Sequence, residues 1–375
     1  KVCKEESVSL EALTQKFTDI YNQDMATLKV QKPDVQPKAT EHMAEIINLI
    51  SSLIEKEYAY VAQGHVLFHV PSFQKYGCLS NRDRDSQLAG SRVEVAPYKK
   101  DPGDFVLWKP SSEDQPGWSS PWGNGRPGWH IECSAMVEAT LGLPIDIHVG
   151  GNDLTFPHHE NELAQSCCGH GSPDDPRSFV RYWMHNGFVT VNDEKMSKSI
   201  GNTKLVHDLI QEFSGETLRL SLLSSHYRQP LNWGQDLLDQ SQSILDRFYR
   251  VLYETRDVVC NLDDLDENER CDLLKPILTP LCDDLNTSKA MAELNQLAKE
   301  LIKAYKGKSR DLLKLKSQFI LCGQLMGILY DNPSEFLGYS SSSETNHHEI
   351  DALVDQRTQA RKNRDFQRAD EIRDE

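Results

Sequence analysis

The segment between residues 105 and 148 constrains the fold of this chain more than any other. Two short apolar runs, Phe105–Trp108 and Ile145–His148, flank a helical pattern that extends from about Gly128 to Leu141. Two strands joined by a crossover helix are typical of a parallel sheet with helices packed against it. The sequence therefore predicts an α/β domain around this segment.

A glycine-rich turn follows the second of these runs. Gly150, Gly151 and Asp153 come directly after the predicted strand. In α/β sheets, the turn at the carboxyl end of a strand is where ligands bind. Because aspartate and glycine are also common in ordinary turns, these residues alone leave a structural role open.

Apolar spacing predicts helices on both sides of the α/β segment. Residues 8–29, and a second stretch that Thr40 would cap, carry apolar side chains at helical spacing. Tyr58–Val70 alternates like a hairpin of strands. From Thr217 onward the pattern is almost wholly helical, which predicts a helical bundle.

Size and composition indicate a large soluble protein. A chain of 375 residues exceeds what one hydrophobic core usually serves, so we expect several domains. No apolar stretch is long enough to predict a membrane span. The 9 cysteines are scattered and odd in number, which argues for a reducing cytosol and a cytoplasmic protein.

The net charge of -16 argues against a nucleic-acid partner, because phosphate contacts need lysine and arginine. Two local clusters of lysine and arginine nevertheless occur in the C-terminal third. Each is either a solvated helix face or a surface that contacts nucleic acid. They consist of Lys299, Lys303, Lys306, Lys308 and Arg310, and of Arg357, Arg361, Lys362, Arg364 and Arg368.

The strongest chemical pattern is the run Lys195, Met196, Ser197, Lys198 and Ser199, called here the signature segment. Two lysines and two serines make a cationic loop that donates hydrogen bonds. Such a loop can close over a triphosphate and neutralise the charge that develops when the α-phosphate is attacked. A given five-residue run arises by chance in roughly one protein in ten thousand, so an ordinary surface loop explains it poorly.

A second pattern is a candidate metal site. Pro157 suits the first turn of a helix, and His158 and Glu162 would then share a face one turn apart. Imidazole and carboxylate are zinc ligands, as is the thiolate of Cys133 upstream. The spacing alone leaves open a routine surface pair beside a small buried cysteine.

The chain resembles the cysteinyl-tRNA synthetases over its whole length. The signature segment matches that of class I aminoacyl-tRNA synthetases without a departure. Gly125–Met136, Phe156–Glu162, Asp104–Lys109 and His226–Asn232 resemble motifs of the cysteine family and stand in its order.

The resemblance implies a catalytic zinc ion. Cys133, His158 and Glu162 match three of the family's four protein ligands. The fourth ligand, a cysteine, and the family's His-x-Gly-His segment belong to an N-terminal part that this sequence does not contain, and we expect neither end to be a natural terminus. His159 and Glu160 should point away from the ligand face and be structural.

The resemblance also assigns the substrate pockets. Trp129 would line the cysteine pocket, and His148 would lie near the substrate amine, although a packing histidine remains an alternative. Asp153 would lie near the ribose, and Gly150 and Gly151 would contact ATP.

The implied reaction is the ATP-dependent loading of cysteine onto tRNA(Cys). The cysteine carboxylate attacks the α-phosphate of ATP, which is bound with Mg²⁺, and the cysteinyl group then passes to the tRNA. Lys198 would stabilise the phosphate transition state, with Lys195 assisting. Zinc would select cysteine over serine, because it binds a thiolate strongly and a hydroxyl weakly. We expect a monomer with no membrane partner, whose basic clusters contact tRNA.

The fold class that follows is a Rossmann-like α/β catalytic domain, present mainly as its second half, with an insertion and a C-terminal helical bundle. The predicted parts are the end of the first half (1–38), a connective insertion (39–102), the second half with the zinc site (103–175), a stem-contact region (176–240), a tRNA-binding bundle (241–338), a linker (339–348) and a last helical segment (349–375).

Three other functions remain open. A ligase that joins cysteine to an aminosugar would share the nucleotide and zinc segments, although it does not require the long helical region. A catalytically inactive paralogue that binds tRNA would not need an intact signature segment. A metallohydrolase built on His158 and Glu162 would need a general base, and no companion stands at a suitable spacing.

Overall fold

The computed structural model describes residues 8–83, 96–191, 193–196 and 200–339, together with part of 353–374. The chain divides into two compact units. The α/β unit consists of Gln31–Asn202 and Tyr227–Trp233, and the helical unit of Lys1–Val30, Thr203–His226 and Gly234–Glu375. Among the described residues, no helix is both long and apolar enough to cross a membrane. The domain boundaries given above stay predictions.

The first sheet of the α/β unit is antiparallel, with the order β1-β2-β3-β4. Its strands are β1 (Ala59–Ala62), β2 (His65–Phe68), β3 (Phe105–Pro110) and β4 (Gly125–Pro127). The hairpin predicted within Tyr58–Val70 is confirmed, since Ala59 pairs with Phe68 and Ala62 with His65.

The second sheet is parallel, but it does not join the two strands that the sequence predicted to pair. β5 (Ile145–Gly151) pairs in parallel with β6 (Val180–Asn186). The expectation that the 105 and 145 strands share a parallel sheet is wrong, because β3 lies between β2 and β4, antiparallel to both. The chain turns back through β4 before it enters the crossover helix, and β4 reads Gly-Arg-Pro, which carries no strand pattern.

A third, small sheet lies at the base of the signature segment. β7 (Val189–Val191) pairs in parallel with β9 (Leu231–Trp233) and antiparallel with β8 (Glu194–Lys195). With β5 and β6, this sheet confirms the parallel-sheet α/β class.

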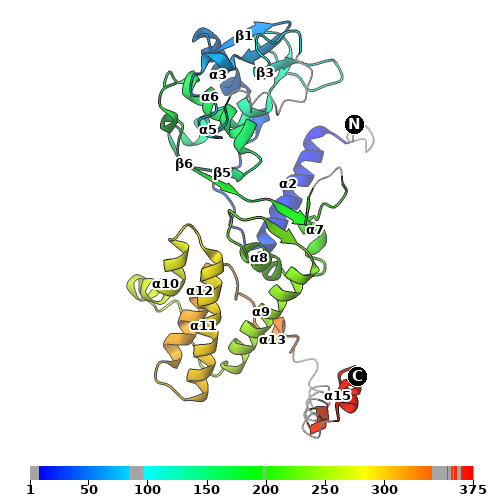
Figure 1. The fold of residues 1–375 in the computed structure, drawn as a ribbon, viewed down its shortest axis with the longest axis vertical. Coiled ribbons are helices and arrows are strands. Elements are labelled where there is room, and N and C mark those ends of the chain that lie inside the picture. The colour runs from blue at the N-terminus through cyan, green and yellow to red at the C-terminus, as the bar shows by residue number, and fades with distance from the viewer. Residues whose placement is uncertain are drawn as a thin grey trace. The chain divides into compact units, whose positions relative to one another are not determined.

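Three helices form the core of the α/β unit with the first sheet. α3 (Met43–Glu55), α5 (Trp129–Leu141) and α6 (Glu160–Gly169) lie side by side in Figure 1. Their apolar faces meet the sheet in one cluster, whose fully buried members include Ile46, Ile50, Leu53, Phe68, Trp108 and Ile131.

The expectation that Thr40 caps the first of these helices is wrong. α3 begins at Met43 after His42, and Thr40 lies in a separate short turn, Ala39–Glu41. That turn is closed by the carbonyl of Lys38, which accepts from the backbone N–H of Glu41 and lies 2.9 Å from Nδ1 of His42.

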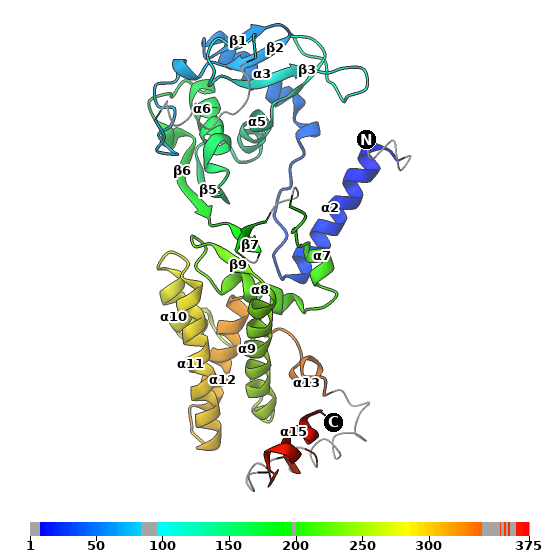
Figure 2. The same ribbon diagram turned by 45° about the vertical axis from the view of Figure 1, so that its right-hand side comes forward.

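The helical unit contains the bundle that the sequence predicted from Thr217 onward. Helices α9 to α12 run side by side in Figures 1 and 2, and Leu245, Phe248 and Leu252 of α9 are buried among them. Among the described residues, the helices of the unit are α2 (Leu10–Thr27), α7 (Val206–Leu209), α8 (Gly215–Leu223), α9 (Gln235–Glu254), α10 (Glu267–Leu281), α11 (Thr287–Lys306), α12 (Leu312–Leu325), α13 (Pro333–Phe336) and α15 (Phe366–Asp374).

A buried carboxylate joins α8 to the rest of this unit. Glu216 is 1% exposed and accepts hydrogen bonds from the hydroxyl of Tyr249 (2.8 Å) and the backbone N–H groups of Leu329 (3.0 Å) and Tyr330 (2.9 Å). Because hydrogen bonds to a charged group are strong, this carboxylate ties α8 to α9 and to the chain after α12.

Candidate functional site

Cys133, His158 and Glu162 come together in the α/β unit. Cys133 lies on α5, His158 in the turn that precedes α6, and Glu162 in the first turn of α6. Their Sγ, ring-nitrogen and carboxylate atoms all lie within 4.8 Å of one another. The helical turn predicted from Pro157 belongs to a π-helical turn, Thr155–His159, that runs directly into α6. His158 and Glu162 face each other there, with Nε2 and Oε1 2.7 Å apart.

The carboxylate of Glu162 has the surroundings of a metal ligand. The side chain is fully buried, and neither oxygen accepts a hydrogen bond from the described residues. Nε2 of His148 lies 3.3 Å from Oε2, but neither this contact nor that of His158 has hydrogen-bond geometry. A buried carboxylate without donors is unfavourable unless a cation compensates it. The sulfur, nitrogen and oxygen donors therefore fit a zinc ion.

The thiol of Cys133 is protonated in this setting. Burial, together with the negative charges of Glu162 and Glu132, raises its pKa to about 12. A metal ligand must be the thiolate, so metal binding would release a proton from this sulfur.

Four further histidines surround the three candidate ligands. Nδ1 of His130 lies 2.7 Å from Nδ1 of His158, and Nδ1 of His159 lies 2.8 Å from Nε2 of His185. Burial, then the neighbouring His158, lowers the pKa of His130 to about 4, and burial, then His148, lowers the pKa of His159 to about 3. These rings are neutral at neutral pH.

Sequence reasoning missed two of these histidines and misplaced a third. His130 lies nearly one helical turn before Cys133, a spacing that could have drawn attention to it. No sequence pattern linked His185 to the site, because β6 brings it there. The expectation that His159 points away is wrong, since one ring nitrogen lies within 4.8 Å of Glu162 and His148. His159 lies in the π-helical turn Thr155–His159 and not in α6, so the side-chain spacing of an α-helix does not apply to it.

Glu160 is structural, as expected. It is fully buried, and its carboxylate accepts hydrogen bonds from the backbone N–H groups of Gly77 (2.9 Å) and Ser80 (2.8 Å). Two glutamates of one helix turn thus have opposite surroundings, one supplied with donors and the other without them.

The residues expected around the substrate lie near this cluster. The ring of Trp129 stacks on His158 with centroids 4.2 Å apart, yet the side chain is 57% exposed. At Gly150 a Cβ atom would lie 2.6 Å from the ring of His159, and at Gly151 2.5 Å from the carboxylate of Asp153. Gly150 and Gly151 are the last two residues of β5, and not a turn as predicted, and a larger residue at either position would have to displace a neighbouring side chain.

Only the start of the signature segment lies in the described part of the chain. Lys195 belongs to β8, opposite Thr190, and Met196 is half-buried. Ser197, Lys198 and Ser199 lie outside the described residues, so their predicted roles stay predictions.

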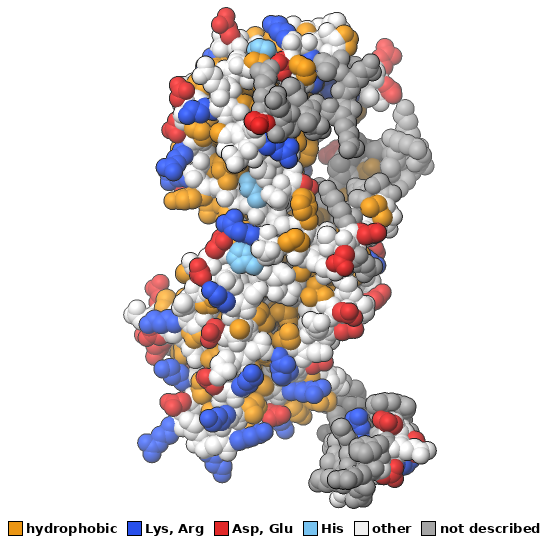
Figure 3. All heavy atoms as spheres, in the orientation of Figure 1, with side chains coloured by type: hydrophobic (Ala, Val, Ile, Leu, Met, Phe, Trp, Pro, Cys, Tyr) orange, Lys and Arg blue, Asp and Glu red, His pale blue; other side chains and the backbone are white. Residues whose placement is uncertain are grey.

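The first basic cluster lies at the end of α11 and in the turn that follows. Lys299, Lys303, Lys306, Lys308 and Arg310 are all exposed. Figure 3 shows lysine and arginine side chains gathered toward that end of the bundle. Of the second cluster, Arg357 and Arg368 are described, and the 340–348 part of the predicted linker lies outside the described residues.

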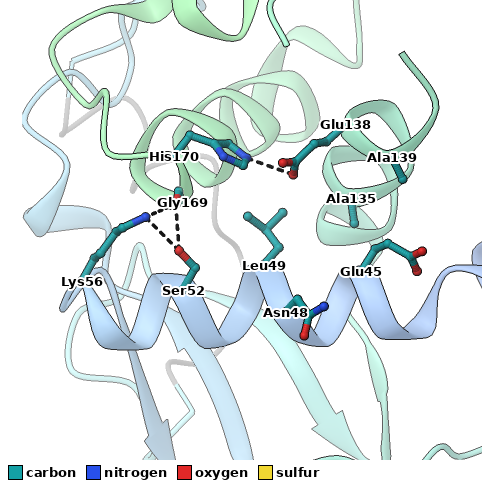
Figure 4. Close-up of a pocket in the computed structure, with 10 residues that line it drawn as sticks. All are labelled: Glu45, Asn48, Leu49, Ser52, Lys56, Ala135, Glu138, Ala139, Gly169 and His170. Atoms are coloured by element: carbon teal, nitrogen blue, oxygen red, sulfur yellow. Dashed lines mark hydrogen bonds and ion pairs between the residues drawn. The ribbon is translucent and has the colours of Figure 1, made fainter. Parts of the chain in front are cut away.

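A separate cavity of about 590 Å³ lies between α3, α5 and the end of α6. Figure 4 shows Lys56 donating to Ser52 and to the carbonyl of Gly169, and His170 paired with Glu138 at 2.9 Å. Since none of the predicted site residues lines it, this cavity is distinct from the metal site.

Comparison with solved structures identifies the fold. The methionyl-tRNA synthetase of Mycobacterium tuberculosis, solved in complex with methionyl-adenylate, matches with a TM-score of 0.53 and 12% identity. The match covers 86% of this chain and 78% of that one. At this identity the likeness shows the fold alone, which is that of an aminoacyl-tRNA synthetase.

Sequence comparison then identifies the family. The model for the catalytic domain of class I (C) tRNA synthetases matches residues 1–243, and a DALR domain model matches residues 279–330. The cysteine–tRNA ligase of Parvibaculum lavamentivorans is 50% identical over 99% of this chain and 77% of its own length. That of Xanthomonas campestris is 49% identical over 98% and 77%. The chain belongs to the class I (C) tRNA synthetase family.

Proposed function

We propose that this chain acts as a cysteine–tRNA ligase, which activates cysteine with ATP and transfers it to tRNA(Cys). The observation that carries the proposal is the convergence of Cys133, His158 and Glu162 around one buried point in a member of this family. The names of the similar relatives support cysteine as the substrate. The DALR match over residues 279–330 and the exposed basic cluster on α11 support tRNA, rather than an aminosugar, as the acceptor.

Cys133, His158 and Glu162 would hold zinc. When bound, zinc would distinguish the substrate thiol from the hydroxyl of serine, because it prefers a soft sulfur ligand. The chain's own residues prepare this site. The neutral ring of His130 orients His158 through its Nδ1 contact, and Trp129 stacks on the same ring and lines the pocket. His148 would meet the substrate amine.

The other end of the pocket would bind ATP with Mg²⁺. Gly150 and Gly151 at the end of β5 would contact the nucleotide, because without side chains their backbone can approach it, and Asp153 would lie near the ribose. Lys195 and Lys198 would stabilise charge on the phosphates as the cysteine carboxylate attacks, with Met196, Ser197 and Ser199 completing the loop around them. We further propose a cytoplasmic monomer.

Replacing Lys198 by Ala in the full-length protein tests the phosphate assignment. Cysteine-dependent exchange of pyrophosphate into ATP should fall by about 100-fold or more, while zinc content stays unchanged. Lys204→Ala, which removes an exposed lysine beyond the segment, is the matched control and should leave the rate intact. An unchanged rate in the Lys198 variant would remove its role.

The acceptor is tested separately. Charging assays with tRNA and with an aminosugar, run on the same protein, should give product only with tRNA. Product with the sugar alone would overturn the proposal.

A further inference from the structure

The side chain of Asn232 makes three hydrogen bonds to the β7–β8 hairpin. It lies on β9, directly opposite Thr190 of β7. Its Oδ1 accepts from the backbone N–H of Asp193 (3.0 Å) and from the hydroxyl of Thr190 (3.2 Å). Its Nδ2 donates to Oδ1 of Asp193 (2.8 Å). One carboxamide thus serves both as acceptor and as donor for the same hairpin.

The residue that Asn232 holds has an unfavourable backbone conformation. Asp193 has φ of 65°, in the left-handed region that few residues other than glycine adopt, although aspartate tolerates it better than most. A residue in this region persists only where surrounding contacts fix it. The two bonds between Asn232 and Asp193 supply such contacts, one to the backbone and one to the side chain.

The turn at Asp193 decides where β8 lies. β8 consists of Glu194 and Lys195, which pair with Val191 and Thr190 across the turn. A strand of two residues has too few ladder bonds to fix its own position. Because β9 is itself paired in parallel with β7, Asn232 ties the turn at Asp193, from which β8 begins, to the two strands β7 and β9.

We propose that Asn232 is a positioning residue for the ATP step, whose carboxamide fixes the turn from which Lys195 and the signature segment begin. The proposal rests on the function proposed above, since it needs that segment to act on the phosphates of ATP. It assigns Asn232 no contact with the substrate. Its chemistry also explains the residue type, because an aspartate could accept from the backbone N–H of Asp193 but would oppose its carboxylate.

Exchanging the two side chains tests this pairing in the full-length protein. Asn232→Asp places two carboxylates against each other and should raise KM for ATP about tenfold in cysteine-dependent exchange, with KM for cysteine unchanged. Adding Asp193→Asn restores a donor opposite the new carboxylate, so the double variant should recover KM for ATP. Amide hydrogen exchange within residues 189–196 should quicken in the single variant and slow again in the double one.

Asn261→Asp is the matched control. Asn261 donates to Asp264 in the helical unit, so the same substitution creates the same repulsion away from the hairpin. This variant should leave both readouts unchanged.

Lys195→Ala, measured in parallel, separates the two proposals. If it raises KM for ATP while Asn232→Asp does not, Asn232 has no positioning role. If adding Asp193→Asn to Asn232→Asp does not restore KM for ATP, the proposed pairing of the two side chains is also overturned. If neither Lys195→Ala nor Asn232→Asp changes KM for ATP, the phosphate role of Lys195 falls and the role of Asn232 falls with it, while Lys198→Ala still tests the proposed function by itself.

Discussion

Glu160 and Glu162 should respond in opposite ways to the same substitution. Both are fully buried on one turn of α6, but Glu160 accepts backbone hydrogen bonds and Glu162 accepts none from the described residues. Replacement by Gln preserves the shape and removes the charge. In the metal-free protein, Glu160→Gln should therefore be destabilising and Glu162→Gln stabilising.

The magnitudes follow from the bonds that each carboxylate makes. Glu160→Gln weakens charge-assisted bonds from Gly77 and Ser80, which should cost about 2 kcal/mol. Glu162→Gln removes a buried charge that lacks donors, which should gain about 1–2 kcal/mol. For a unit of this size, 1 kcal/mol moves Tm by about 2–4 °C, so the two variants should shift it in opposite directions by a measurable amount.

Thermal unfolding in chelator at pH 8, followed by zinc titration, measures both effects. Zinc affinity should fall by at least about 100-fold in Glu162→Gln, since losing even a neighbour of a ligand can cost that much. It should stay unchanged in Glu160→Gln. If Glu162→Gln destabilises the metal-free protein and binds zinc normally, Glu162 is an ordinary structural carboxylate and the reasoning is refuted.

Two further predictions concern pH and the helical unit. As pH falls from 6.5 to about 4, the metal-free protein should lose stability, because burial holds the pKa of His130 at about 4 and the unfolded chain takes up the proton first. In thermal unfolding across this pH range, the His130→Gln variant should lose less stability than the unchanged protein. An equal loss in both would contradict the lowered pKa of His130. Glu216→Gln should lower the free energy of unfolding by about 2 kcal/mol, because its carboxylate accepts three hydrogen bonds. In denaturant titrations, Glu212→Gln at an exposed position is the control. An equally small change in the free energy of unfolding of both variants would contradict the prediction for Glu216.

Local spacing and family resemblance were enough to find the centre of the site. His158 and Glu162 were predicted to face each other from their spacing, and Cys133 joined them through the resemblance. The helix at Trp129–Leu141 and the hairpin at 59–68 also followed from patterns within single segments. These features depend on neighbours in the sequence or on motifs with fixed spacing.

The rest depended on tertiary pairing, which leaves little trace in one sequence. The neighbours of β3 could not be predicted, because β4 has no apolar run. His185 reaches the site only through the parallel pairing of β5 with β6. Asn232 meets Asp193 only because β9 joins β7 from a distant part of the chain.

Zinc X-ray absorption spectroscopy of the full-length protein, with and without cysteine, tests the central claim most directly. The account predicts zinc with sulfur ligands at about 2.3 Å and nitrogen or oxygen ligands at about 2.0–2.2 Å, and one more sulfur when cysteine is added. Absence of zinc, or a ligand shell that cysteine leaves unchanged, would contradict it.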